Sequence, residues 1–163
     1  MRKMLEVVSV AALGCLAWIT AGAMMGPHAL PGRIPVHFDA AGQADGWGPP
    51  KALLGMPVLA AVLYGLMTVV ARFPAAFNFP VRVTPANRPR LEALALEMIT
   101  WLKAEVLCLF AWVQETTVAS ARSGEAHLSP WFMPVTLGAV FATIGWYVAA
   151  MRRVGKTMGP RAG

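Results

Sequence analysis

The chain has 163 residues, of which 57% are hydrophobic and 13% charged, with a net charge of +6 at pH 7. Soluble domains are about 45–50% apolar and about 25% charged, so this composition excludes a disordered chain and argues against a soluble enzyme. The basic residues flank apolar stretches and lack interleaved aromatic residues, which favours a membrane protein over a nucleic-acid-binding one. We therefore expect the lipid bilayer as a partner, and no nucleic acid.

Four stretches are long and apolar enough to cross a bilayer, because a hydrocarbon core of about 30 Å needs roughly 20 apolar residues in a helix. They are residues 5–25, 52–70, 99–119 and 131–151. The sequence predicts an all-α membrane protein in which residues 1–163 form a single domain of four transmembrane helices. No enzymatic activity, catalytic residue or cofactor is expected, since nucleotide-binding and zinc motifs and a nucleophile–base pair are absent.

The basic residues predict the orientation, because cytoplasmic loops of membrane proteins are enriched in Lys and Arg. Most of them lie before the first expected span, between the second and third, or after the fourth: Arg2, Lys3, Arg72, Arg82, Arg88, Arg90, Arg152, Arg153, Lys156 and Arg161. We therefore expect cytoplasmic termini, a cytoplasmic segment 71–98 and an outer loop 26–51. Cleavage of the first span as a signal peptide stays open, since Ala21-Gly22-Ala23 matches a cleavage site.

The outer loop 26–51 is rich in glycine and proline, yet its pattern is typical of fixed structure. Every second residue from position 34 is apolar, which predicts a short extended segment with one apolar face. These residues are Ile34, Val36 and Phe38. His37 and Asp39 then lie together on the opposite face, and Asp45-Gly46 indicates a turn. We expect a compact loop packed on the ends of the helices.

Two interpretations of the polar residues in this loop stay open. His37, Asp39 and Asp45 are acceptable ligands for a divalent metal or contacts for a cationic ligand. Alternatively, their side chains bond the nearby backbone and fix turns, as short polar residues commonly do. We favour the second interpretation, so that no metal is expected and these three residues are weak candidates only. His28 and His127 are expected to be interfacial residues.

The order of residues in the outer loop resembles the signature of a small bacterial integral-membrane family, domain-of-unknown-function family 1648. The motif is Leu30-Pro31-x-x-Ile34-Pro35-x-His37-Phe38-x-x-x-Gly42-x-x-Asp45-Gly46-Trp47-Gly48. A second segment is similar to the same family: Asn78-Phe79-Pro80-Val81-x-Val83-Thr84-x-x-Asn87, followed by Trp101-Leu102-Lys103. This domain also forms the N-terminal half of immunity proteins against the sporulation-delaying (Sdp-type) toxin. The family pattern has asparagine at the position of Asp39.

The resemblance implies a location in the bacterial cytoplasmic (inner) membrane and recognition of a membrane protein or peptide partner. The loop residues expected to contact that partner are Ile34, Pro35, Val36, His37, Phe38, Asp39, Asp45 and Trp47. The second half typical of the immunity proteins does not follow the fourth expected span. The resemblance therefore implies fold and location more directly than immunity, and it leaves the oligomeric state open.

The third expected span belongs to a helical pattern over residues 88–121, about 50 Å long at 1.5 Å per residue. On a helical wheel, a polar stripe occupies one face. Its members are Glu97, Trp101, Glu105, Cys108, Trp112 and Glu115. Ionisable groups in a span usually face a protein interior or a water cavity, so we expect the stripe to face the bundle or a partner. Alternatively, most of its carboxylates are interfacial. Lys103 lies on another face and is expected to snorkel to the cytoplasmic interface.

Three functions fit these features. The first is a non-enzymatic, immunity-like or signalling-like protein that recognises a partner or toxin through its outer loop. The second is an accessory or assembly subunit of a larger membrane complex, for which the polar stripe would be the interface. The third is a small transporter or metal-binding protein, which we rank last because four short spans leave little room for a transport cavity.

Overall fold

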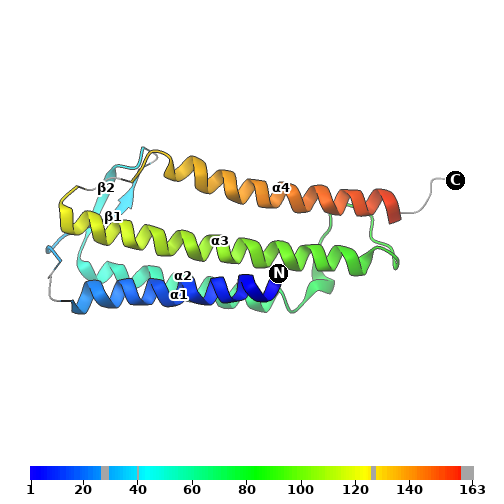
Figure 1. Ribbon diagram of the computed structural model, residues 1–163, viewed down its shortest axis with the longest axis horizontal. Helices are drawn as coiled ribbons and strands as arrows, with labels where there is room; N and C mark the ends of the chain where they lie inside the picture. The colour runs from blue at the N-terminus through cyan, green and yellow to red at the C-terminus, as the bar shows by residue number, and fades with distance from the viewer. Residues whose placement is uncertain (27–29, 40, 126–127, 159–163) are drawn as a thin grey trace.

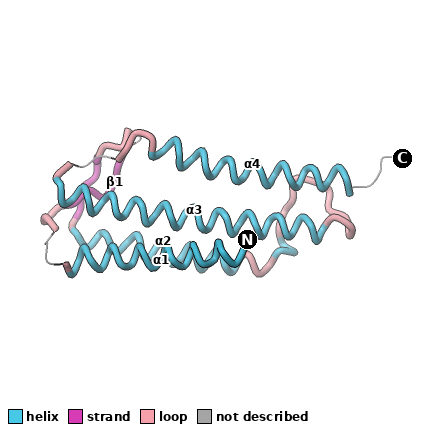
Figure 2. The backbone as a smooth tube through the Cα atoms, in the orientation of Figure 1, coloured by secondary structure: helices cyan, strands magenta, loops and turns pink. Residues whose placement is uncertain are grey.

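The computed structural model describes the chain except for residues 27–29, 40, 126–127 and 159–163. The described residues form four α-helices and a two-stranded hairpin (Figures 1 and 2). The helices are α1 (Arg2–Met25), α2 (Gly55–Val70), α3 (Arg88–Ser123) and α4 (Phe132–Met158). The strands are β1 (Ile34–Phe38) and β2 (Ala44–Gly48), and two short 3-10 turns are η1 (Pro50–Leu54) and η2 (Pro74–Ala76).

Three helical segments are long and apolar enough to cross a membrane: Arg2–Met25, Pro50–Val70 and Phe132–Met158. They agree with the first, second and fourth expected spans and with a multi-pass membrane protein. The central helix α3 has 36 residues, which is ample length. It is not among the three because charged residues such as Lys103 and Glu105 interrupt its apolar stretch.

The central helix of the bundle is α3, which α1 and α2 flank on one side and α4 on the other (Figure 1). The helices α1 and α3 run in one direction, and α2 and α4 run in the other. Small residues let α1, α2 and α3 approach closely, since Ala12 and Ala60 pack around Leu16 and Leu107. In a bilayer such packing and interhelical hydrogen bonds hold helices together, because lipid tails are as apolar as the side chains.

The ends of the bundle differ in construction. At one end the hairpin covers a cluster of Ala23, Ile34, Leu53, Val118 and Ala121. We call this the hairpin end. At the other end, which we call the terminal end, α1 begins, α4 ends and the segment between α2 and α3 turns back (Figure 1). There Leu91, Leu94, Ala95, Tyr147 and Met151 form the cluster that joins α3 to α4.

The hairpin is a departure from the expected all-α fold. The extended segment over β1 was predicted, but its pairing with Ala44–Gly48 was not. Glycine, alanine and aspartate are poor strand formers, so β2 carries no strand signal of its own. Its backbone becomes a strand because β1 offers a partner that is fixed on the helix ends.

Candidate functional site

A glycine turn joins the tip of the hairpin to the start of α4. Gly42 has φ of +81°, a backbone conformation that side chains other than glycine rarely adopt. Its carbonyl oxygen accepts a hydrogen bond of 2.6 Å from the backbone N–H of Leu128, just before α4. A Cβ atom at Gly42 would lie 2.6 Å from the carbonyl oxygen of Leu128. The turn of the hairpin is therefore fixed to the start of α4.

A buried side-chain amide fixes the helix ends on which the hairpin packs. Gln114 of α3 donates from Nε2 to Oγ1 of Thr20 at 2.7 Å and to the carbonyl oxygen of Leu53 at 3.0 Å. These bonds join α1, α3 and η1 directly beneath β1, whose first residue Ile34 is fully buried. A buried polar network that is satisfied in this way rigidifies its surroundings. The hairpin thus lies on a fixed platform.

The outward surface of the hairpin combines two apolar side chains with a hydrogen-bonded His–Asp pair. Val36 and Trp47 are each 46% exposed. Nδ1 of His37 lies 2.5 Å from Oδ1 of Asp45, and both side chains are exposed. We call Val36, His37, Asp45 and Trp47 the hairpin surface. It offers apolar area and charge to a partner without any rearrangement of the backbone.

The expected alternation of faces is wrong for this segment. Ile34 and Pro35 are both buried, whereas Val36 and His37 are both exposed. The cause is an irregular register, which shifts between Pro35 and His37 and again between His37 and Phe38. An irregular register of this kind re-aims side chains relative to a regular strand. Val36 is consequently half-exposed, although it still lines a small cavity with Leu53 and Gln114.

The structure favours the turn-fixing role of Asp39 over a ligand role. Its Oδ1 accepts hydrogen bonds from the backbone N–H groups of Ala41, at 2.9 Å, and of Gln43, at 2.8 Å. His37 pairs with Asp45 and not with Asp39. Across the described residues, no group of three or more His, Cys, Asp or Glu side chains is placed to hold a metal ion. His28 and His127 lie outside the described residues.

The polar stripe of α3 divides into two halves. In the first half, carboxylates accept hydrogen bonds from hydroxyl groups of α4. Thr143 donates to Oε1 of Glu105 at 2.5 Å, and Tyr147 donates to Oε2 of Glu97 at 3.5 Å. In the second half, Cys108, Trp112 and Glu115 are exposed. The ring of Trp112 meets Phe132 edge-on at 4.9 Å. The first half of the stripe therefore faces α4, and the second half is exposed on the surface of the bundle.

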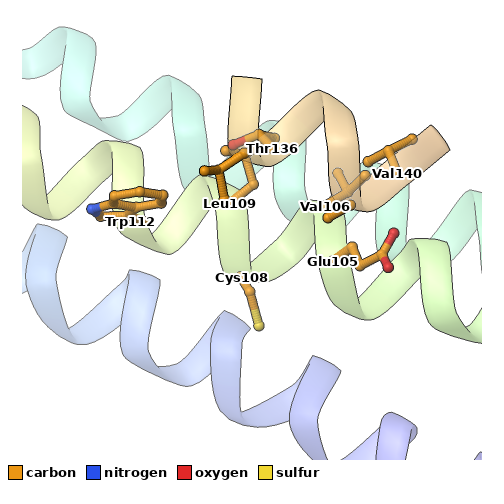
Figure 3. Close-up of a pocket in the computed structure, with 9 residues that line it drawn as sticks. Glu105, Val106, Cys108, Leu109, Trp112, Thr136 and Val140 are labelled. Carbon is orange, nitrogen blue, oxygen red and sulfur yellow. The ribbon is translucent and has the colours of Figure 1, made fainter. Parts of the chain in front are cut away.

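Glu105 lies on the ridge between two apolar grooves. A cavity of about 260 Å³ lies between α3 and α4, and one of about 500 Å³ lies between α3 and α1. Glu105 and Cys108 line both, and Figure 3 shows Cys108 pointing away from α4. Oε2 of Glu105 is buried and has no hydrogen-bond partner among the described residues. An unsatisfied buried carboxylate oxygen is costly, which makes Glu105 a candidate contact for a partner.

The prediction for Lys103 is wrong, because the side chain does not snorkel to the interface. Only 2% of it is exposed. Its Nζ atom donates to Oε1 of Glu6 at 2.6 Å and to Oγ1 of Thr68 at 3.1 Å, and lies 4.7 Å from the ring centroid of Tyr64. Both α1 and α2 cover it. The sequence carried a signal for this site, since Glu6 and Lys103 are opposite charges within two apolar helices and such charges usually pair.

Comparison with known proteins gives one match. Residues 12–61 match the model of a family described as a domain of unknown function, DUF1648. The match runs from α1 through the hairpin into α2, so it contains the whole hairpin surface. No curated protein and no solved structure matches the chain. Over residues 12–61 the chain is thus similar to the DUF1648 family, which agrees with the resemblance of the hairpin motif.

Proposed function

We propose that the chain is a non-enzymatic protein of the bacterial cytoplasmic membrane that recognises a membrane protein or peptide partner through the hairpin surface. In this proposal α3 is a fourth transmembrane helix. The position of α3 supports this assignment, because α3 packs against all three helices that are long and apolar enough to cross a membrane. Its charged residues Lys103 and Glu105 have partners on those helices, which lowers the cost of placing them in lipid.

The proposed orientation places the terminal end in the cytoplasm and the hairpin outside. Its support is the charge at the terminal end, where basic residues gather on the segment between α2 and α3, on the start of α3 and on the end of α4 (Figure 1). They are Arg72, Arg82, Arg88, Arg90, Arg152, Arg153 and Lys156. At the hairpin end, Arg33, Lys51 and Arg122 are the basic residues of the described segments.

One observation carries the recognition proposal: the hairpin is fixed from both sides, yet Val36, Trp47 and the His37–Asp45 pair remain exposed. Apolar residues on a rigid support bind partners well, because little conformational entropy is lost on binding. Tryptophan is enriched among the residues that dominate binding energy at interfaces. A peptide toxin is the first partner to test, since the hairpin motif resembles the N-terminal half of Sdp-type immunity proteins.

The test compares what stays bound to purified variants. Wild type, Val36→Asp and Trp47→Ala are expressed in a bacterial host, purified in mild detergent and analysed by mass spectrometry for retained proteins and peptides. The matched control is Trp131→Ala, which removes an exposed tryptophan outside the hairpin. We expect one stoichiometric polypeptide that is retained by wild type and control and lost from both hairpin variants. The same retained set in all four proteins would contradict the proposal.

The second candidate function is an accessory or assembly subunit of a larger membrane complex. Glu105 favours it, because its unsatisfied oxygen lies beside two apolar grooves that a transmembrane helix of another subunit could line. In this case Cys108→Trp, which narrows both grooves, removes the retained subunit, and Trp47→Ala does not. Cys15→Trp, at the other exposed cysteine, is the control. Retention in Cys108→Trp would exclude these grooves as the interface.

A further inference from the structure

A third groove lies at the terminal end of the bundle, where α2, the segment around η2, α3 and α4 meet. Its volume is about 660 Å³, which exceeds that of either groove beside Glu105. The walls come from α2, the segment around η2, α3 and α4, and they are mostly apolar. The lining residues are Val70, Ala76, Phe77, Asn78, Phe79, Pro80, Ala95, Met98, Ile99, Val148 and Met151.

The outer wall of this groove is a fixed structure. Phe77, Phe79, Val81 and Val83 pack against the cluster that joins α3 to α4. The segment approaches α4 so closely that a Cβ atom at Gly155 would lie 2.7 Å from Cγ1 of Val81. The neighbouring turn is also fixed, since buried Asn87 accepts from the N–H of Thr84 at 2.8 Å and donates to the carbonyl of Arg82 at 3.0 Å. The groove is therefore preformed.

The height of this groove along the bundle matches the edge of a bilayer. Val70, the last residue of α2, lies with Ile99 in its wall. Met1, at the start of α1, lines a cavity with Trp101, so α1 begins at the same height on α3. Beyond it, α3 and α4 continue without α1 beside them (Figure 1). Lipid headgroups lie at the height where membrane-spanning helices begin and end.

Two arginines lie in the sequence next to residues that line this groove. Arg152 follows Val148 by one helical turn and so lies on the same face of α4, directly after the lining residue Met151. Arg72 follows the end of α2 by two residues. Both are exposed, and neither forms an ion pair with a described residue. No carboxylate lines this groove. An apolar groove beside two arginines complements a ligand with an apolar tail and an anionic head.

From this geometry we propose that the groove binds one anionic phospholipid of the adjacent leaflet. An acyl chain lies along Met98, Ile99 and Val148, and the phosphate lies between Arg72 and Arg152. Arginine suits this role because its planar fork of donors matches a phosphate group. The amide of Asn78, in the same wall, supplies a further donor. The inference does not depend on the function proposed above, because this groove lies at the opposite end of the bundle from the hairpin.

The test is lipid retention by the full chain. The protein is reconstituted in nanodiscs of equal parts phosphatidylglycerol and phosphatidylcholine, transferred to detergent and examined by native mass spectrometry. We expect one retained phosphatidylglycerol per chain in wild type and about a fivefold loss of that preference in Arg152→Gln, since one basic residue at an anionic surface contributes on that order. The control is Arg153→Gln, which removes the same charge about 100° away on the helix. Equal retention by the two variants would overturn the proposal.

A second pair of variants tests the acyl chain. Val148→Trp fills the groove and is expected to abolish retention of both lipids, whereas Ala149→Trp, on the next and exposed position of α4, retains them. Thermal unfolding in detergent confirms that each variant is folded. Glycerol phosphate, which has the head without the tail, is expected not to displace the lipid. Retention by Val148→Trp, or displacement by glycerol phosphate, would show that this groove is not the lipid site.

Discussion

The Nζ atom of Lys103 lies 2.6 Å from Oε1 of Glu6, although 97 residues separate them. This ion pair ties the middle of α3 to the first turns of α1, and Thr68 adds a link to α2. Lys103 is almost completely buried, whereas the side chain of Glu6 is 42% exposed. The pair thus orders three helices around one cation.

Replacing one partner of this pair is expected to destabilise the bundle. Glu6→Leu leaves the Lys103 ammonium buried without its counter-ion, which typically costs about 3 kcal/mol or more. The partial exposure of Glu6 puts the expected loss at the lower end of that range. The measurement is the unfolding free energy in detergent, with Lys51→Met as the control that removes a surface lysine. Adding Lys103→Met to Glu6→Leu should recover most of the loss, and additive losses would contradict the pairing.

The packing of the helix ends beneath β1 depends on Gln114. Gln114→Leu removes the hydrogen bonds to Thr20 and to the carbonyl of Leu53, both in buried surroundings, and should cost about 1–3 kcal/mol. Backbone amides of β1 should then exchange with deuterium more rapidly. The exposed Gln43, changed to leucine, is the control. Unchanged exchange over β1 in Gln114→Leu would mean that the amide does not support the hairpin.

The turn of the hairpin requires glycine at position 42. Gly42→Ala places a side chain at φ of +81° and against the carbonyl of Leu128, so we expect a loss of about 1–2 kcal/mol and a detached turn. Gly32→Ala is the matched control, because it has ordinary φ and nothing within 4 Å of the added atom. The measurement is thermal unfolding of the two variants. Equal melting temperatures would contradict the requirement for glycine at position 42.

Glu105 and Thr143 are expected to respond in different ways. Glu105→Leu removes a carboxylate with an unsatisfied buried oxygen, and the Thr143 hydroxyl that it leaves can bond the carbonyl one turn earlier in α4, so we expect little loss of stability. Thr143→Val instead takes away the hydroxyl donor and leaves Glu105 unpaired, which should cost about 1–3 kcal/mol. Unfolding in detergent measures both. A large loss of stability in Glu105→Leu would show that the carboxylate is structural and remove the argument for a partner there.

The helices could be predicted from the sequence because lipid imposes a simple requirement on length and hydropathy. The outer hairpin was located by its ordered motif, and the family match confirms that segment. What a helical wheel cannot supply is the identity of neighbours. It placed Lys103 away from the polar stripe correctly, but it could not show that Thr68 and the ring of Tyr64 also lie beside the ammonium. The surroundings of Glu105 likewise depend on Thr143, which no local pattern links to α3.

Two further features escaped prediction for local reasons. The exposure of Val36 results from an irregular strand register, which single-residue alternation cannot express. The segment over residues 77–83 alternates apolar residues as a strand does and contains Pro80. It packs on α3 and α4 without a strand partner among the described residues. Side-chain packing and the hydrogen bond from Asn87 to the carbonyl of Arg82 therefore hold the segment there.

The hydrogen bond between Gly42 and Leu128 has a mechanical consequence. The hairpin turn is joined to the base of α4, and the far end of α4 is clamped by the contact of Gly155 with Val81. A ligand that displaces the turn therefore pulls first on α4, which packs mainly against α3. The two ends of the bundle are thus connected through α4, whereas Lys103 links the other three helices to one another.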